Sequence, residues 1–596
     1  MRLKALFFLW LFGASAALAQ NAPVLFFTDL DSGPATGNSD STYTSNGGVY
    51  VTLYGNFLDS GTAKLNGASC LTVVSGPATW MWYERMVVQV TNGCSTGNFT
   101  VTTSKGTSNG IPFTVRGGNI YYVSKSGSDN NSGTFSSPWA TMPNAIQTMA
   151  AEGVTYVENG VTQPSTDNQG WGALTFRNSW CGAGPNGYPR ALIAYPGATA
   201  TVGSNTYSGN TFYPVDYSAT GGACTGYWTW GELTVRASAT AFSINGPQNG
   251  SGVTSGNGSN HWRVIGNDVS CPGGQGATAC MHTAYTSTTT ANTIQNFVSG
   301  NNFHVDNTSV SADDQYHGIY LGDNTRWVDV GWNTVSNVVG CRGIQLYSNY
   351  QDEWGITLHD NTIHDTSCDG IVIANVDPSK GAVSAYNNVL YNVGKGPQNT
   401  SEGGGSWNCI YHDRHVQPAG SSGSGTINVY NNSCYKWGNV QNSIYEDCDN
   451  TEAGISIANN DDSTTENMQN NILYAAGSNK QCSTNFPYWM NSTGTSGAMS
   501  GTNNLMFGAG SPPSGSVTNS VNSSPSFVST STPDLHLSTA SSPANGAGSA
   551  SNTPKYDHDG LVRPSPPSIG AYEYASGSTT TVQPPAPPTN LQAVVN

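Results

Sequence analysis

The stretch GWNTVSNVVGCRGIQLY, residues 331–347, joins a turn asparagine to a short run of alternating apolar residues. An asparagine recurs in this local frame about every 30 residues, with two longer intervals. The column comprises Asn302, Asn333, Asn361, Asn388, Asn432 and Asn471. Because an Asn at one turn of every coil can hydrogen-bond to its neighbours above and below, we expect a scaffold ladder along a stack of coils.

An isoleucine inside an alternating apolar run forms a second column. Its members are Ile319, Ile344, Ile371, Ile410 and Ile455. Alternation with a period of two residues is typical of a strand with one buried face. The two registered columns predict an all-β solenoid of parallel strands, with a core that continues through the stack.

The composition favours many short strands and turns. Only 9% of the 596 residues are charged, whereas 71 are Gly; a helical bundle would use more Glu, Lys, Ala and Leu. The formal net charge of −16, with only 20 Lys and Arg, argues against a nucleic-acid partner. It also disfavours a strongly anionic polymer unless basic groups gather in one groove.

The two ends of the chain differ from the rest. Residues 1–19 carry two basic residues, an apolar run and a small-residue cleavage signature, which predicts a signal peptide. No second apolar run long enough to cross a bilayer follows, so we expect no transmembrane segment and a secreted protein, extracellular or at the cell surface. Residues 576–596 are rich in Pro and Thr, as in linkers and disordered tails.

The 12 cysteines of an exported chain are most simply explained as disulfides. Local spacing suggests the pairs Cys70–Cys94, Cys181–Cys224 and Cys271–Cys280, although sequence does not fix connectivity. Zinc-type spacing of Cys and His is absent from the sequence, which argues against a thiolate metal site.

Residues 20–117 look like a separate unit. Short alternating runs such as GVYVTLYG and RMVVQVT, joined by turn-rich segments, indicate a small β-sandwich. Through GGVYVTLYGNFL and SNGIPFTV this unit resembles the immunoglobulin-like IPT/TIG domains of secreted proteins. The resemblance implies a spacer or binding role.

Residues 118–575 are the predicted solenoid. The segment 119–153 orders a strand, a turn region and a short helix over 139–151. It resembles the entry segment of right-handed parallel β-helix proteins of the pectate-lyase-like superfamily, in which a helix covers the open end, and YPRALIAYPGATATVG (188–203) resembles an early coil. YDHDGLVRPSPPSIGAYEY (556–574) resembles the closing segment of choice-of-anchor-type β-helix proteins, which implies surface retention or a last coil. The expected fold is a right-handed parallel β-helix after an immunoglobulin-like sandwich.

His317, Arg342 and Asp369 occupy one slot in consecutive coils, two residues before the isoleucine column. Parallel strands lie about 4.8 Å apart, so these side chains should form a row, which Asn408 continues. Strict alternation would point the row inward, as a polar ladder in which Asp369 and His317 neutralise Arg342. A glycine after the slot indicates a bend in three of the four coils, which would turn the row toward a groove as catalytic groups. Both interpretations stay open.

A second group of titratable residues follows in YHDRHVQ, residues 411–417, where His412, Asp413 and Arg414 are candidate catalytic residues. TLHDNTIHDT, residues 357–366, holds another cluster of His and Asp around its turn. Catalysis needs titratable groups in one place, and histidine changes charge near neutral pH.

The leading hypothesis is β-elimination of a uronate-containing polysaccharide. This reaction needs a cation at the carboxylate, a base for the C5 proton and an acid for the leaving oxygen. Arg342 or Arg414 could supply the cation, and the other roles could fall to His317, His412, Tyr316 and Tyr411. Related β-helix lyases often use calcium, and hard oxygen ligands are offered by Asp313, Asp314 and Asp323.

A glycoside hydrolase is the first alternative. It needs two carboxylates about 5–10 Å apart, which Asp369 could form with Asp313, Asp314 or Asp413. CDGIVI, the DD pair at 313–314 and YHGIYLG resemble slots of family-28 polygalacturonases written TDG, DD and GHG. The order along the chain differs, however, and the RIK element of that family is missing.

Aromatic residues within the coils could stack on sugar rings. The candidates for substrate binding are Tyr316, Trp327, Trp354, Trp407 and Tyr411. The second alternative is a non-catalytic cell-surface or glycan-binding β-helix, for which the sandwich, the closing segment and the low charge would suffice. We expect a monomer in each case.

Overall fold

The computed structural model describes residues 21–575 with internal gaps. The residues left out are 1–20, 207–208, 215–225, 238–239, 246–259, 272–278, 285, 287–293, 306–315, 349–352, 395–406, 415–422, 439–452, 460, 476–488, 492–497, 509–515 and 576–596. The predicted signal peptide and Pro/Thr-rich tail therefore lie outside the described residues.

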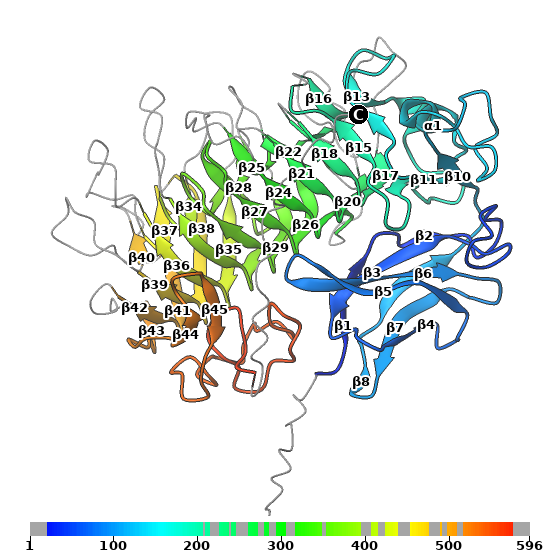
Figure 1. Ribbon diagram of the computed structural model, residues 1–596. Helices are drawn as coiled ribbons and strands as arrows, with labels where there is room; N and C mark the ends of the chain where they lie inside the picture. The colour runs from blue at the N-terminus through cyan, green and yellow to red at the C-terminus, as the bar shows by residue number, and fades with distance from the viewer. Residues whose placement is uncertain are drawn as a thin grey trace, which may run out of the picture.

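Three long parallel sheets, here called the first, second and third sheets, wind around one core in the described part of the chain (Figure 1). The first sheet contains β10 (Ile120–Val123), β11 (Val154–Val157), β14 (Arg190–Ala194), β17 (Gly226–Gly231), β20 (Asn260–Ile265), β23 (Asn296–Ser299), β26 (Arg326–Gly331), β29 (Trp354–His359), β32 (Val383–Tyr386), β35 (Ser424–Tyr430), β38 (Ser463–Gln469), β41 (Met499–Thr502) and β43 (Val517–Thr518). The second contains β12 (Thr162–Gln163), β15 (Thr201–Gly203), β18 (Thr234–Arg236), β21 (Asp268–Ser270), β24 (Asn302–His304), β27 (Thr334–Ser336), β30 (Thr362–His364), β33 (Val389–Val393), β36 (Ser433–Trp437), β39 (Ile472–Tyr474) and β42 (Leu505–Phe507). The third contains β13 (Gly172–Phe176), β16 (Asn210–Pro214), β19 (Phe242–Asn245), β22 (Ala279–Ala284), β25 (His317–Leu321), β28 (Arg342–Leu346), β31 (Ile371–Ala374), β34 (Ile410–Asp413), β37 (Ile455–Ala458) and β40 (Trp489–Asn491).

Each complete coil gives one strand to each sheet, so the chain is a right-handed parallel β-helix, as the sequence predicts. The isoleucine column is confirmed: Ile319, Ile344, Ile371, Ile410 and Ile455 pair in register from β25 to β37 and are buried. Helix α1 (Met142–Thr148) covers the N-terminal end of the solenoid and is shorter than the sequence indicated (Figure 1). The helix is capped at its N-terminus by Thr141, whose Oγ1 accepts a hydrogen bond from the backbone N–H of Asn144. A separate 3-10 turn, η1 (Asn178–Trp180), lies further along the chain.

The asparagine ladder runs along the turn between the first and second sheets. Asn333 shows its geometry: Nδ2 donates to Asn361 Oδ1 at 3.0 Å and to a backbone carbonyl at 2.8 Å, while Oδ1 accepts two bonds from Asn301. The ladder consists of Asn267, Asn301, Asn333, Asn361, Asn388, Asn432, Asn471 and Asn504. All are buried, so every rung satisfies polar groups that water cannot reach.

One rung of the predicted ladder is wrong. Asn302 is the first residue of β24, where it pairs with Thr334 and donates to Asp268. Asn301 occupies the turn instead, because in SGNNFHV the first of the two asparagines precedes the strand.

Before the solenoid, two antiparallel-rich sheets face each other. One contains β1 (Val24–Thr28), β3 (Tyr50–Asn56), β6 (Tyr83–Val90) and β5 (Leu71–Trp80). The other contains β2 (Ser32–Gly33), β9 (Ile111–Val115), β7 (Gly97–Thr103), β4 (Thr62–Leu65) and β8 (Gly106–Thr107). The apolar core between them continues into side chains of β10, β11 and β14, so the sandwich packs on the outside of the first sheet.

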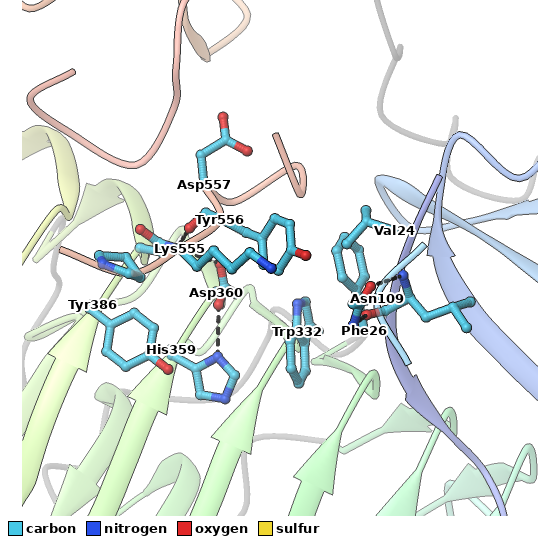
Figure 2. A pocket seen from close by; sticks show the side chains of 13 residues that line it. Val24, Phe26, Asn109, Trp332, His359, Asp360, Tyr386, Lys555, Tyr556 and Asp557 are labelled. Carbon is cyan, nitrogen blue, oxygen red and sulfur yellow. Dashed lines mark hydrogen bonds and ion pairs between the residues drawn. The ribbon is translucent and has the colours of Figure 1, made fainter. Parts of the chain in front are cut away.

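Polar contacts also fix the sandwich on the solenoid. Tyr54 Oη donates to Glu232 at 2.9 Å, and Trp80 Nε1 donates to the carbonyl of Gly300 at 2.8 Å. The sandwich is thus a docked part of the molecule and not a detached spacer. Where it meets the solenoid and the C-terminal segment, the three parts enclose a pocket (Figure 2).

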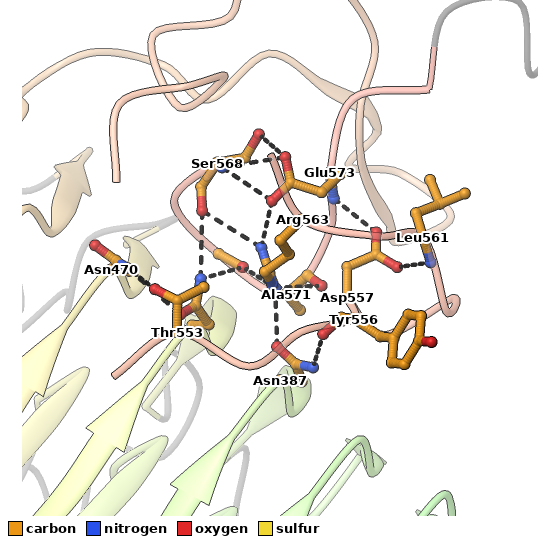
Figure 3. Close-up of polar contacts among 12 residues, drawn as sticks. Asn387, Asn470, Thr553, Tyr556, Asp557, Leu561, Arg563, Ser568, Ala571 and Glu573 are labelled. Atoms are coloured by element: carbon orange, nitrogen blue, oxygen red, sulfur yellow. Dashed lines mark hydrogen bonds and ion pairs between the residues drawn. The ribbon is translucent and has the colours of Figure 1, made fainter. Parts of the chain in front are cut away.

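The C-terminal segment folds back on the solenoid after a small antiparallel pair, β44 (Phe527–Ser529) and β45 (Asp534–Leu537). Residues 556–574 add no strand to the three parallel sheets, so the last-coil interpretation is wrong. Buried Arg563 is their centre: it donates to Glu573 Oε1 at 2.6 Å and to Asn387 Oδ1 at 2.8 Å (Figure 3). Surface retention stays a prediction.

Four disulfides join described cysteines. Cys70–Cys94 and Cys271–Cys280 confirm two predicted pairs. Cys224, the partner suggested for Cys181, lies outside the described residues. The structure adds Cys341–Cys368 and Cys409–Cys434, which the sequence reasoning did not pair. Among the described residues, no helix is both long and apolar enough to span a bilayer.

Candidate active site

Bends before the isoleucine column turn part of the predicted row outward. A Cβ added to Gly318 would lie 2.5 Å from Val335 Cγ1 in the core, so this glycine faces inward, and Gly343 is placed in the same way. Because Ile319 also faces the core, the bend breaks strict alternation at Gly318. The His317 ring stacks on Tyr320, which lies between the inward-facing Ile319 and Leu321 and so points to the outer face of the third sheet. Arg342, the register partner of His317, is placed on the same face. The bend therefore favours the groove interpretation for these two residues.

His317 and Arg342 are register partners on β25 and β28. The His317 ring stacks on Tyr320 with a centroid distance of 5.0 Å, and the residue as a whole is 6% exposed. Its buried Nδ1 makes no hydrogen bond with any residue that the structure describes. Burial, and then the positive charge of Arg342, lower the pKa of His317 well below 6.5, so the imidazole is neutral at pH 7.

Tyr320 and His282 extend this group across a third strand. His282 on β22 pairs with Tyr320 and stacks on its ring at 5.1 Å. Burial lowers the pKa of His282 to about 4, whereas burial and nearby carboxylates raise the pKa of the Tyr320 hydroxyl above its ordinary value. At neutral pH the site thus combines two neutral imidazoles, a protonated phenol and one guanidinium.

Arg342 is held from two sides. Its Nη1 donates to Gln345 Oε1 at 3.1 Å, and its Nε lies 3.7 Å from Asp369 Oδ2. Asp369 is fully buried, and its Oδ1 accepts two bonds from Asn408. The far end of the row, at Asp369 and Asn408, is therefore an internal polar ladder. For His317 and Arg342, at the near end, the catalytic interpretation stays a prediction.

The cluster at 411–414 is divided between two faces of β34. His412 is buried among core side chains, with Nδ1 at 3.3 Å from Glu466, and Arg414 pairs with Asp462 at 3.1 Å in the interior. His412 and Arg414 thus each lie against a buried carboxylate of the solenoid interior, which favours a structural role, and their catalytic role stays a prediction. Asp413 and Tyr411 alternate with His412 and lie on the outer face, half-buried.

Most of the aromatic residues that were predicted to stack on sugar rings are buried or in contact with other side chains. Tyr316, Trp327 and Trp407 are buried, the first against Cys280. The Trp354 ring contacts two cations, the guanidinium of Arg326 at 3.9 Å and the ammonium of Lys380 at 4.8 Å from its centroid. Tyr411 alone among the predicted sugar-binding residues remains on the outer face of the third sheet.

The structure describes only part of the predicted calcium site. Asp313 and Asp314 lie outside the described residues, and Asp323 follows β25 and is half-buried. Among the residues that are described, no three His, Cys, Asp or Glu side chains are grouped as metal ligands.

Sequence reasoning missed His282, Tyr320 and Gln345. The signal was present, because ACMHTA (279–284) has the alternating frame of HGIYL, with Met281 in the isoleucine slot. This strand is not recognised as part of the isoleucine column because it carries a methionine at that position and because a long interval separates it from the next coil.

Comparison with known proteins gives structural similarities only. No protein-family description matches the sequence, and no curated protein sequence matches. Among solved structures, a pectate lyase, Pel9A, is similar at 15% identity and a TM-score of 0.40, over 76% of this chain and 96% of that one. A rhamnogalacturonan lyase shows 15% identity and a TM-score of 0.34 over 68% and 87% of the two chains. A family 28 exopolygalacturonase of Yersinia enterocolitica shows 11% and 0.33 over 84% and 96%. Values this low carry no argument about activity.

Proposed function

We propose that the protein is a secreted enzyme that cleaves a uronate-containing polysaccharide by β-elimination on the outer face of the third sheet. The observation that carries the proposal is a neutral His317 imidazole with a hydrogen-bond-free Nδ1, in register with the guanidinium of Arg342 and stacked on Tyr320. A base, a cation and an acid thus lie within two adjacent strands.

The residues divide the reaction as follows. Arg342 binds the uronate carboxylate, which makes the C5 proton more acidic. The His317 imidazole takes that proton, and the electron pair left on C5 forms the C4–C5 double bond. The C4–oxygen bond breaks, and the departing oxygen takes a proton from the Tyr320 hydroxyl.

The hydrolase alternative has less support. It requires a pair of accessible carboxylates, whereas Asp369 is fully buried and already accepts two hydrogen bonds. Secretion is supported by the four disulfides among the described residues, since such bonds persist in oxidising compartments.

The test is a screen of the mature protein against uronate-containing and neutral polysaccharides. We expect new ultraviolet absorbance from an unsaturated product with at least one uronate polymer. His317→Gln should lower kcat/KM about 100-fold or more, since a general base contributes about that much. Arg342→Gln should lower the cleavage rate mainly for uronate-containing polymers, because it removes the guanidinium that binds the uronate carboxylate.

Two matched controls sit on the second sheet. His364→Gln and Arg236→Gln alter partly exposed residues of the same types, outside the third sheet, and should leave the rate within about twofold. Reducing ends without ultraviolet absorbance would indicate a hydrolase instead. No product from the whole panel, or unchanged rates in both third-sheet variants, would overturn the proposal.

A further inference from the structure

The pocket between the sandwich, the solenoid and the C-terminal segment is a separate feature from the row on the third sheet. It is half-open to solvent, has a volume of about 260 Å³ and is lined by residues from all three parts of the chain. Val24, Phe26 and Asn109 come from the sandwich, and Lys555 and Tyr556 come from the C-terminal segment (Figure 2). Pockets of this kind often lie where domains meet.

The wall contributed by the solenoid is held rigidly. His359 donates hydrogen bonds from both ring nitrogens, to Asp329 at 3.0 Å and to Asp360 at 2.7 Å. Burial opposes its protonation, but the two carboxylates prevail and raise the pKa of His359 to about 10. The Trp332 ring lies edge-on to His359 at 4.5 Å and stacks on Phe26 of the sandwich at 5.6 Å.

The wall contributed by the C-terminal segment is also held in place by hydrogen bonds. Asn387 Nδ2 donates both to the carbonyl of Tyr556 at 2.9 Å and to Asp360 Oδ1 at 3.0 Å. The backbone that carries Lys555 and Tyr556 is therefore tied to the same carboxylate that orients His359. A ligand would meet preformed walls, which lowers the ordering cost of binding.

Several polar groups of the pocket remain available. The hydroxyls of Tyr386 and Tyr556 and the ammonium of Lys555 make no hydrogen bond to any described residue, although the ammonium lies 4.8 Å from the Tyr556 ring. Each Asp360 oxygen accepts one bond from its neighbours and can accept another. Aromatic rings, hydroxyl donors and a carboxylate acceptor thus line one small space.

We infer that this pocket binds a single sugar ring of a saccharide, at a site distinct from the row on the third sheet. Its volume falls just below the roughly 300–1,000 Å³ of pockets for drug-sized ligands, which suits one ring. A sugar offers C–H bonds to aromatic rings and hydroxyls to the Tyr386, Tyr556 and Asp360 side chains. This inference does not rest on the proposed lyase activity.

Calorimetric titration of the mature protein with methyl glycosides of neutral hexoses and uronic acids, and with short oligosaccharides, tests the inference. Tyr556→Ala should weaken binding about tenfold, because an aromatic contact and a hydroxyl are lost. Tyr386→Phe keeps the ring stack and removes only the hydroxyl, so it should weaken binding severalfold. Tyr43→Ala, at an exposed tyrosine of the sandwich, is the matched control and should change nothing.

The outcomes separate the two sites. Binding that survives in His317→Gln but falls in both pocket variants, with unchanged unfolding midpoints, supports the inference whether or not the protein cleaves polysaccharide. Binding lost in His317→Gln would place the sugar on the third sheet and overturn it. Absence of binding to every ligand would also overturn the inference. So would affinities in Tyr386→Phe and Tyr556→Ala that equal the affinity of the unmodified protein.

Discussion

Two polar columns run along this solenoid and differ in every property except their repeat. The asparagine ladder repeats one residue type, is buried, and pairs each amide with the next coil, as at Asn333 and Asn361. The row on the third sheet changes type from His317 to Arg342 in neighbouring strands, and His282 lies beside it as the register partner of Tyr320. The row leaves His317 Nδ1 without a hydrogen bond to any described residue.

The difference teaches how to separate scaffold from site in a repeat protein. A stack of identical amides satisfies itself, so its cost of burial is met within the fold. A mixture of titratable groups cannot do this, and burial shifts the pKa values of His282 and His317 instead. Changes in the first column should affect stability, and changes in the second should affect chemistry.

The largest expected effect is on the ladder. Asn361→Ala removes the acceptor for two bonds from Asn333 and leaves Asn388 Oδ1 short of a donor, all in the dry interior. We expect a loss of about 3–5 kcal/mol in the free energy of unfolding, measured by denaturant titration.

Asn302→Ala is the control for that experiment, because Asn302 lies one residue outside the ladder and is half-buried. It should cost about 1 kcal/mol or less. Equal losses in the two variants would contradict the assignment of the rungs.

The bend at Gly318 should give an intermediate effect on both stability and activity. A Cβ there would meet Val335 at 2.5 Å and the carbonyl oxygen of Gly343 at 2.7 Å, so the strand must shift. Gly318→Ala should cost about 1–3 kcal/mol and lower the cleavage rate, because His317 moves with the strand. Gly76→Ala, where nothing lies within 4 Å of the new Cβ, is the control for thermal unfolding and should be nearly neutral.

The smallest effect concerns the pH dependence of cleavage. The neutral imidazole is the active form, and the pKa of His317 lies well below 6.5. As the pH falls from 7, kcat/KM should therefore hold through pH 6.5 and decline only below it. In Arg342→Gln the loss of a neighbouring positive charge should raise the pKa of His317 and move the decline to higher pH. A half-maximal rate at or above pH 6.5 in the unmodified protein would contradict the role of His317 as base.

Local sequence patterns predict much of the fold but less of the candidate site. The isoleucine column and most of the asparagine column were predictable, because a repeat puts the same residue at the same place in each coil. Cys341 and Cys368 share one frame in consecutive coils, so the repeat also brings the two cysteines of this disulfide close together. His412 and Asp369 were not separable from His317 by pattern, since their burial depends on strands of other sheets.

By itself the sequence determined that this protein is a stack of parallel strands with an amide ladder, since period-two alternation and a coil-length repeat are local properties of the chain. The tertiary structure alone decided that Gly318 faces the core, that His317 therefore leans outward, and that His412 is enclosed. It also decided that the sandwich and closing segment meet the solenoid around a pocket. Such outcomes depend on which surfaces pack together at long range, and no local spacing encodes them.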